Sequence, residues 1–196
     1  MSSITVKRMK DFDRDVRNEA TAVFIDGYFK GLSFFSKDRN KLMKAFKNLL
    51  CEDVFYLAEM DGEIVGILAC ANHQQRAMPI KLSELKKGFG FLKGILAYMM
   101  LKREFNTPLA FSEDTAYIEC VATTEKARGK GVSTALFQYV MCELPYRHYI
   151  LEVVDTNQNA HRLYKKLGFE EFERKMEKYA KLKGFHARIL MRWSQQ

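Results

Sequence analysis

The sequence has few prolines, no closely spaced cysteines and no long apolar run. Three prolines among 196 residues, with 47% hydrophobic and 29% charged residues, are typical of a folded globular chain. No apolar run approaches the about 20 residues of a membrane span, and the opening MSSITVKRMKDFDRDV lacks the apolar core of a secretory signal. We therefore expect one domain over residues 1–196, located in the cytoplasm, without integral membrane association.

The cysteines argue against two kinds of site. They lie far apart without C-x-x-C spacing, at Cys51, Cys70, Cys120 and Cys142. This spacing indicates neither a zinc cage nor a small disulfide framework. No metal is expected.

The net charge of +8 attracts anions such as nucleotides, nucleic acid or lipid head groups, without distinguishing among them. The basic residues are spread along the sequence, and no run of about five or more like charges marks a nucleic-acid tail. Nor does the sequence show clustered Lys and Arg with interleaved aromatics. A nucleic-acid partner is therefore not expected.

Two amphipathic helices are predicted before the first strand. From Asp13 to Phe29, apolar residues recur at spacings of three and four. The same pattern runs from Leu42 to Leu50, after Ser36, which is a candidate amino-terminal cap. Residues 54–60 and 63–71 then form β-rich runs joined at Asp61-Gly62, which predicts an antiparallel hairpin.

Residues 73–113 contain an apolar, lysine-dotted segment punctuated by glycine and proline, including FGFLKGILAYMML. We interpret it as an inserted helical segment that packs over the core near the acceptor site. The apolar part is too short to cross a bilayer, although it could lie in a membrane interface. Packing over the core is the favoured interpretation.

The second half of the chain predicts a strand over residues 115–123, a helix over 132–144 and a buried strand over 149–154. A short helix follows and ends at Gly168. Two further strands are centred on residues 169–175 and 187–193. The expected fold is an α/β (α+β) sandwich that contains a strand, helix, strand crossover.

The stretch Arg128-Gly129-Lys130-Gly131 lies between a predicted strand and a predicted helix. Unpaired N–H groups and the helix dipole favour an anion there, and glycines let the backbone approach a phosphate. Val132-Ser133 after Gly131 does not fit a Walker A loop, and Thr134 does not fit a dinucleotide fingerprint. A tight turn with solvent-facing basic residues explains such a loop equally well.

Two longer motifs lie in order between Thr115 and Phe172. The first is V-A-T-T-E-K-A-R-G-K-G-V-S-T-A-L, which begins at Val121. The second is N-x-x-A-x-x-L-Y-x-x-x-G-F, matched by Asn157, Ala160, Leu163, Tyr164, Gly168 and Phe169. With both motifs the chain resembles the GNAT superfamily of acetyl-coenzyme A-dependent N-acetyltransferases.

This resemblance implies a mixed, mostly antiparallel central sheet with helices on both faces, and acetyl-coenzyme A as acyl donor. The pantetheine arm would bond to backbone along the strand that ends at Val121, Ala122 and Thr123, where neighbouring strands splay. The diphosphate would bind the backbone of residues 129–134, and Asn157 would contact the ligand or serve only as a helix cap. The cofactor site so implied comprises Val121, Ala122, Thr123, Arg128, Gly129, Lys130, Gly131, Val132, Ser133, Thr134, Asn157 and Tyr164.

The resemblance also implies direct attack by an acceptor amine. Tyr164 would protonate the leaving thiolate, with a packed core tyrosine as the alternative. Glu119 would act as base directly or through water, or would be an ordinary salt-bridged strand residue. A strand N–H near Val121 would stabilise the oxyanion. Strand alternation places Glu119 with Tyr117, Val121 and Thr123, and Cys120 on the opposite face, which disfavours an acyl-cysteine route.

The acceptor stays open between a small-molecule amine and a peptide or protein amine. A non-catalytic acyl-coenzyme A-binding module of the same fold is the main alternative function, and retention of Tyr164 argues against it. The sequence does not fix the oligomeric state, and a homodimer is compatible with it.

Overall fold

The computed structural model describes residues 3–195. Within them a seven-stranded sheet has the order β1-β2-β3-β4-β5-β7-β6. Neighbouring strands are antiparallel except for β4 and β5, so the expected mixed, mostly antiparallel sheet is confirmed. The strands are β1 (Ile4–Arg8), β2 (Phe55–Met60), β3 (Glu63–Ala71), β4 (Thr115–Thr123), β5 (His148–Val154), β6 (Glu170–Met176) and β7 (Ala187–Ser194).

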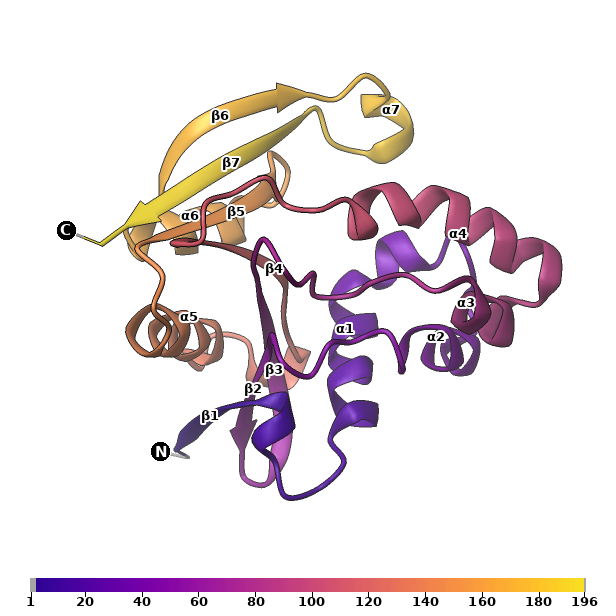
Figure 1. The fold of residues 1–196 in the computed structure, drawn as a ribbon, viewed down its shortest axis with the longest axis horizontal. Coiled ribbons are helices and arrows are strands. Elements are labelled where there is room, and N and C mark those ends of the chain that lie inside the picture. The colour runs from indigo at the N-terminus through magenta and orange to yellow at the C-terminus, as the bar shows by residue number, and fades with distance from the viewer. Residues whose placement is uncertain (1–2, 196) are drawn as a thin grey trace.

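Helices cover both faces of this sheet, as predicted (Figure 1). A first core cluster joins the sheet to the amino-terminal helices and the 73–113 segment, and a second joins its other face to α5 and α6. The helices are α1 (Arg17–Leu32), α2 (Arg39–Phe46), α3 (Leu82–Phe89), α4 (Phe91–Asn106), α5 (Val132–Glu143), α6 (Gln158–Lys166) and the short α7 (Ala180–Lys183).

The amino-terminal strand β1 was not predicted from the sequence. It pairs only with β2, at the edge of the sheet, and its residues alternate between half-buried and exposed. Such a short, half-polar segment carries a weak strand signal. The following helix α1 begins at Arg17 rather than near Asp13, because the Asp15 carboxylate accepts the Arg17 N–H at 2.9 Å in a local turn.

The cap predicted for the second helix was wrong. Asp38 caps α2, and its carboxylate accepts the N–H of Asn40 at 2.9 Å, while Ser36 accepts the N–H of Asp38 one turn earlier. The helix ends at Phe46, so Leu50 is buried from the turn that follows it.

The predicted hairpin of β2 and β3 is confirmed. Asp61 has φ 54° and Gly62 has φ 78°, which is the pair of left-handed residues that a two-residue hairpin turn requires.

The strand, helix, strand crossover β4-α5-β5 is confirmed as well, with β4 and β5 parallel. Gly66 on β3 lets α5 approach, because a Cβ at this position would lie 2.4 Å from Val132 Cγ1.

The 73–113 segment is helical, with α3 and α4 joined at Gly90, where φ is 79°. Helix α3 lies directly against α2, since a Cβ on Gly88 would stand 2.5 Å from Ala45 Cβ. No helix in residues 3–195 has both the length and the apolar character needed to cross a bilayer.

Candidate active site

A bulge in β4 defines the centre of the candidate site. Ile67 and Ala69 of β3 are two residues apart, but their partners on β4, Ala122 and Glu119, are three residues apart, so β4 contains one extra residue. Within this bulge Cys120 has a positive φ of 56°. The extra residue shifts the alternation of side chains. Ile118 belongs to the second core cluster, whereas Cys120 and Ala122 belong to the first.

The bulge overturns the strand-face prediction for Glu119. Val121 packs against the second core cluster, and Thr123 Oγ1 lies 2.9 Å from Ser133 Oγ on α5, so both lie on the α5 side of the sheet. Glu119 precedes the bulge and contacts residues of the 73–113 segment on the other side. Cys120 therefore shares a side with Glu119 instead of facing away from it.

The sheet opens beside the bulge. Pairing of β4 with β5 ends at Ile118 and Leu151, so the rest of β4 has no β5 partner. On this free stretch the Val121 carbonyl accepts a hydrogen bond from the Tyr28 hydroxyl of α1 at 3.3 Å. Backbone groups in such a gap can bond to an extended ligand, as the sequence led us to expect for residues 121–123.

Tyr28 brings α1 to this opening. Burial, and then the nearby Cys120, Tyr164 and Glu119, raise the pKa of Tyr28, although 39% of the residue's surface is exposed. Gly27 makes the approach feasible, because a Cβ there would lie 2.5 Å from Ala122 Cβ. In the sequence Tyr28 falls within the apolar pattern of the first predicted helix, between Asp13 and Phe29, and belongs to no motif.

The loop that follows β4 has the features of an anion site. The first helical hydrogen bond of α5 runs from the Ala135 N–H to the Gly131 carbonyl at 2.9 Å. The N–H groups of residues 132–134 therefore have no carbonyl partner within the helix. No described side chain caps this helix. Gly129 and Gly131 have φ values of 75° and 85°, and a Cβ on either would meet no atom within 4 Å. Together with the exposed Arg128 and Lys130, the loop presents donors, open space and positive charge.

Tyr164 lies on α6, on the same side of the sheet as α5, and Asn157 immediately precedes this helix. Tyr164 is 7% exposed and packs against Phe137 and Phe169, with ring centroids 5.3 and 6.2 Å away. Burial raises the pKa of Tyr164 to about 12, without a hydrogen bond from any described residue. The Asn157 Oδ1 accepts the Ala160 N–H at 3.3 Å, which confirms the helix-cap interpretation of this residue.

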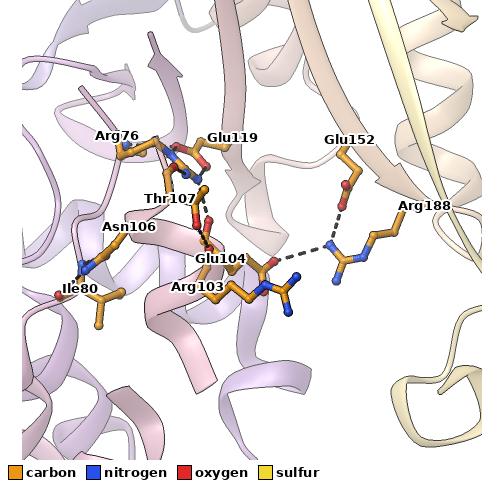
Figure 2. A network of polar contacts seen from close by, with 10 residues as sticks. Arg76, Ile80, Arg103, Glu104, Asn106, Thr107, Glu119, Glu152 and Arg188 are labelled. Carbon is orange, nitrogen blue, oxygen red and sulfur yellow. Dashed lines mark hydrogen bonds and ion pairs between the residues drawn. The ribbon is translucent and has the colours of Figure 1, made fainter. Parts of the chain in front are cut away.

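Glu119 is held in an ion pair (Figure 2). Its Oε2 accepts from Arg76 Nη2 at 3.1 Å and its Oε1 from the Ala77 N–H at 3.1 Å, with the two charged side chains only 11% and 13% exposed. Arg76 also donates to the carbonyls of Glu104 and Thr107 at the end of α4. This geometry supports the salt-bridged interpretation of Glu119 that the sequence left open.

A second ion cluster lies nearby (Figure 2). Arg188 on β7 contacts Glu152 of β5 at 2.6 Å, Glu177 at 3.5 Å and Glu104 of α4 at 3.6 Å. Both arginines therefore connect the 73–113 segment to the sheet. Neither Arg76 nor Arg188 was predicted, because isolated arginines far apart in the sequence carry no motif.

The first sequence motif lies along the opening in the sheet, and Tyr164 of the second motif lies near Tyr28, whose hydroxyl donates to the Val121 carbonyl. The free half of β4 lies between the loop of residues 128–134 and the approach of Tyr28 and Tyr164. Among residues 3–195 no group of three or more His, Cys, Asp or Glu side chains is arranged to hold a metal ion.

Comparison with known proteins agrees with this geometry. The model of the Acetyltransferase (GNAT) family matches residues 25–169, which is more than half of the chain. No curated protein sequence matches.

Several solved structures share the fold. An N-acetyltransferase from Staphylococcus aureus Mu50 is 16% identical, with a TM-score of 0.61 and coverage of 96% of this chain and 100% of the other. The ribosomal-protein-S18-alanine N-acetyltransferase from Escherichia coli is 14% identical, with a TM-score of 0.55 and coverage of 99% and 94%. A GNAT family acetyltransferase from Elizabethkingia anophelis with acetyl-CoA bound is 13% identical, with a TM-score of 0.54 and 98% coverage of both chains.

Proposed function

The chain belongs to the acetyltransferase (GNAT) family, and from that premise we propose that it moves an acetyl group from acetyl-coenzyme A to the amine of an acceptor. The observation that carries the proposal is the half of β4 that has no β5 partner, which continues through a loop with open glycines to the amino terminus of α5. Acetyl-coenzyme A supplies the acetyl thioester. Residues of this chain bind it, orient it and move protons.

We assign the diphosphate to the backbone of residues 129–134, where the N–H groups of residues 132–134 precede the first helical hydrogen bond of α5. These donors lie at the amino end of a twelve-residue helix, whose dipole favours negative charge. Arg128 and Lys130 add charge from the solvent side. Gly131 leaves the space that a phosphate needs, because no atom stands within 4 Å of the position of a Cβ.

Along β4 we assign the pantetheine arm to the backbone of Val121, Ala122 and Thr123. The hydrogen bond between Thr123 and Ser133 ties this stretch to the start of α5, so the two parts of the cofactor site keep a fixed spacing. Asn157 uses its Oδ1 as a helix cap, which leaves its Nδ2 group available to donate to the ligand.

Tyr164 is the proposed general acid. Its pKa of about 12 keeps the phenol protonated at neutral pH, so the hydroxyl can donate to the departing sulfur. Packing against Phe137 fixes the ring, which limits the directions in which the hydroxyl can point. The packing of Tyr164 in the core is therefore compatible with the proposed catalytic role.

Glu119 is proposed as a positioning residue that holds the bulge of β4 against the 73–113 segment. Its carboxylate already accepts from Arg76 and from the Ala77 backbone, which leaves less of it free to take a proton from an amine. A base role for Glu119 is the alternative, and the first prediction in the Discussion separates the two.

The acceptor is an amine of a small molecule, a peptide or a protein. Among the structural neighbours, the Escherichia coli enzyme is named for an alanine of a ribosomal protein, which supports including peptide amino termini among the candidates. We propose that the acceptor reaches the opening from the side of Glu119 and the 73–113 segment.

A thiol-release assay with acetyl-coenzyme A against a panel of amines and peptide amino termini tests the proposal. We expect release above background with at least one acceptor, and a reduction of about 10²-fold in Tyr164→Phe. Tight binding of coenzyme A with no release for any acceptor would instead favour a non-catalytic acyl-coenzyme A-binding module.

A further inference from the structure

Helix α4 is apolar on two opposite faces, although it lies at the surface. One face packs on the first core cluster through Ala97, Tyr98, Leu101 and Phe105. The opposite face exposes a row of large apolar side chains, each about half exposed or more, formed by Leu92, Leu96, Met99 and Met100, and Phe91 is exposed at the start of the helix. A helix that is hydrophobic all round is normally buried, so this outer face calls for a partner.

The exposed row follows the helix repeat. Leu92, Leu96 and Met99 fall at spacings of four and three, so they line one stripe along a helix of sixteen residues, about 24 Å long. Arg103 continues the same stripe at its carboxyl end. Figure 1 shows α4 along the outer side of the molecule, away from the sheet.

Basic residues border this stripe. Lys93 follows Leu92, the Lys102 Nζ lies 5.6 Å from the Tyr98 ring, and the Lys86 Nζ lies 4.2 Å from the Phe91 ring. Aliphatic stems of lysine can lie along apolar surface while the ammonium reaches toward an anion.

The net charge of the protein is concentrated in this region. Residues 37–47 and 81–106 together contain eleven Lys and Arg but only three Asp and Glu, so their net charge of +8 equals that of the whole chain. The remaining residues carry 21 charges of each sign. No single run of charge marks this in the sequence, but the fold packs α2 against α3 and brings the two segments together.

We propose that α4 binds peripherally to membranes rich in anionic lipid. The stripe Leu92, Leu96 and Met99 enters the head-group region, while the lysines and arginines of the α2–α4 unit contact lipid phosphates. An apolar stripe bordered by lysine matches the requirements of an interfacial helix. Nucleic acid fits less well, because it offers no apolar surface to Leu and Met side chains. The proposal does not depend on the acetyltransferase activity.

Co-sedimentation of the full chain with vesicles tests the proposal. The probes are vesicles of phosphatidylcholine alone and vesicles containing equal parts of phosphatidylcholine and phosphatidylglycerol. We expect binding to the anionic vesicles at low salt, little binding to the neutral ones, and a marked loss at about 1 M salt, where the screening length falls to about 3 Å. Absence of binding to the anionic vesicles at low salt, or equal binding to both kinds, overturns the proposal.

A matched pair of double variants locates the contact. Leu92→Glu with Met99→Glu replaces residues that are 79% and 55% exposed, and Met176→Glu with Tyr179→Glu replaces residues that are 72% and 66% exposed elsewhere. Both pairs change the net charge equally. We expect about tenfold or greater weakening of vesicle binding for the α4 pair and a much smaller effect for the control pair. Equal effects would overturn the proposal.

Two further measurements cover the remaining outcomes. If the α4 pair fails to fold, hydrogen exchange of the wild-type chain should show vesicle-dependent protection over residues 91–106, and protection elsewhere alone would contradict the proposal. Light scattering tests a second copy as occupant. Self-association that the α4 pair abolishes, without vesicle binding by the wild type, would assign this face to a protein dimer instead.

Discussion

Replacing Glu119 with glutamine separates an anchoring role from a base role. The substitution keeps the side-chain shape, and the Gln Oε1 can still accept the Ala77 N–H, but the charge opposite Arg76 is lost. Because these side chains are 11% and 13% exposed, solvent cannot replace the lost partner well. Arg76 would retain the carbonyls of Glu104 and Thr107, which moderates the effect.

We expect Glu119→Gln to lower the free energy of unfolding by about 2 kcal/mol, the size of a hydrogen bond to a charged group. For a chain of this length, that corresponds to a fall in Tm of about 4–8 °C. Thermal unfolding and steady-state turnover are measured on the same preparations. If Glu119 anchors the 73–113 segment, Arg76→Met should reduce stability and turnover similarly, and the double variant should lose little more than either single variant.

A base role predicts a different pattern. Glu119→Gln would then abolish turnover even where the variant is fully folded, while Arg76→Met would leave the carboxylate in place and retain activity despite a similar loss of stability. That outcome would refute the anchoring argument. Glu173→Gln is the matched control, because its pair with Lys175 at 3.4 Å is about half exposed and contributes little.

Three other substitutions test the site. Tyr164→Phe should reduce turnover about 10²-fold while coenzyme A affinity changes little, and wild-type turnover with chemistry rate-limiting would exclude the acid role. Gly131→Asp should abolish coenzyme A binding in calorimetry, because it adds negative charge and a side chain at φ 85°, and unchanged affinity would refute the placement of the diphosphate. Gly66→Ala should lower the free energy of unfolding by about 1–3 kcal/mol, since its Cβ would lie 2.4 Å from Val132 Cγ1, and an unchanged Tm would show that α5 shifts freely.

Local signals in the sequence predicted the parts of the fold that depend on neighbouring residues. Asp61-Gly62 predicted the hairpin because a two-residue turn requires left-handed backbone, which both residues adopt. The crossover through residues 115–154 was predicted because buried strands and an apolar helix face have distinct periods. Strand β1 was not predicted, because an edge strand with one half-buried face needs few apolar residues and so gives a weak hydrophobic pattern.

Parts of the site that depend on distant contacts were not predictable in this way. Arg76 and Glu119 are 43 residues apart, and nothing in the sequence around Arg76 indicates a carboxylate partner. The contact exists because the fold brings the start of the 73–113 segment, which carries Arg76, next to β4, which carries Glu119. The position of Tyr28 also depends on a contact between distant segments. It could not be predicted from the sequence, because it requires the close approach of α1 to β4 that Gly27 allows.

The β4 bulge changes the reason for which Cys120 is disfavoured as an acyl-accepting nucleophile. Regular alternation placed Cys120 away from Glu119 and thereby disfavoured an acyl-cysteine route, but the positive φ of Cys120 removes that reason. Burial provides another, because it raises the pKa of the Cys120 thiol well above its usual range and keeps the sulfur protonated. A protonated, buried thiol is a poor nucleophile, so direct attack by the acceptor amine is still the better-supported route. The bulge that moves Cys120 also lies where pairing with β5 ends, so the residue that breaks the regular strand alternation lies at the opening of the sheet.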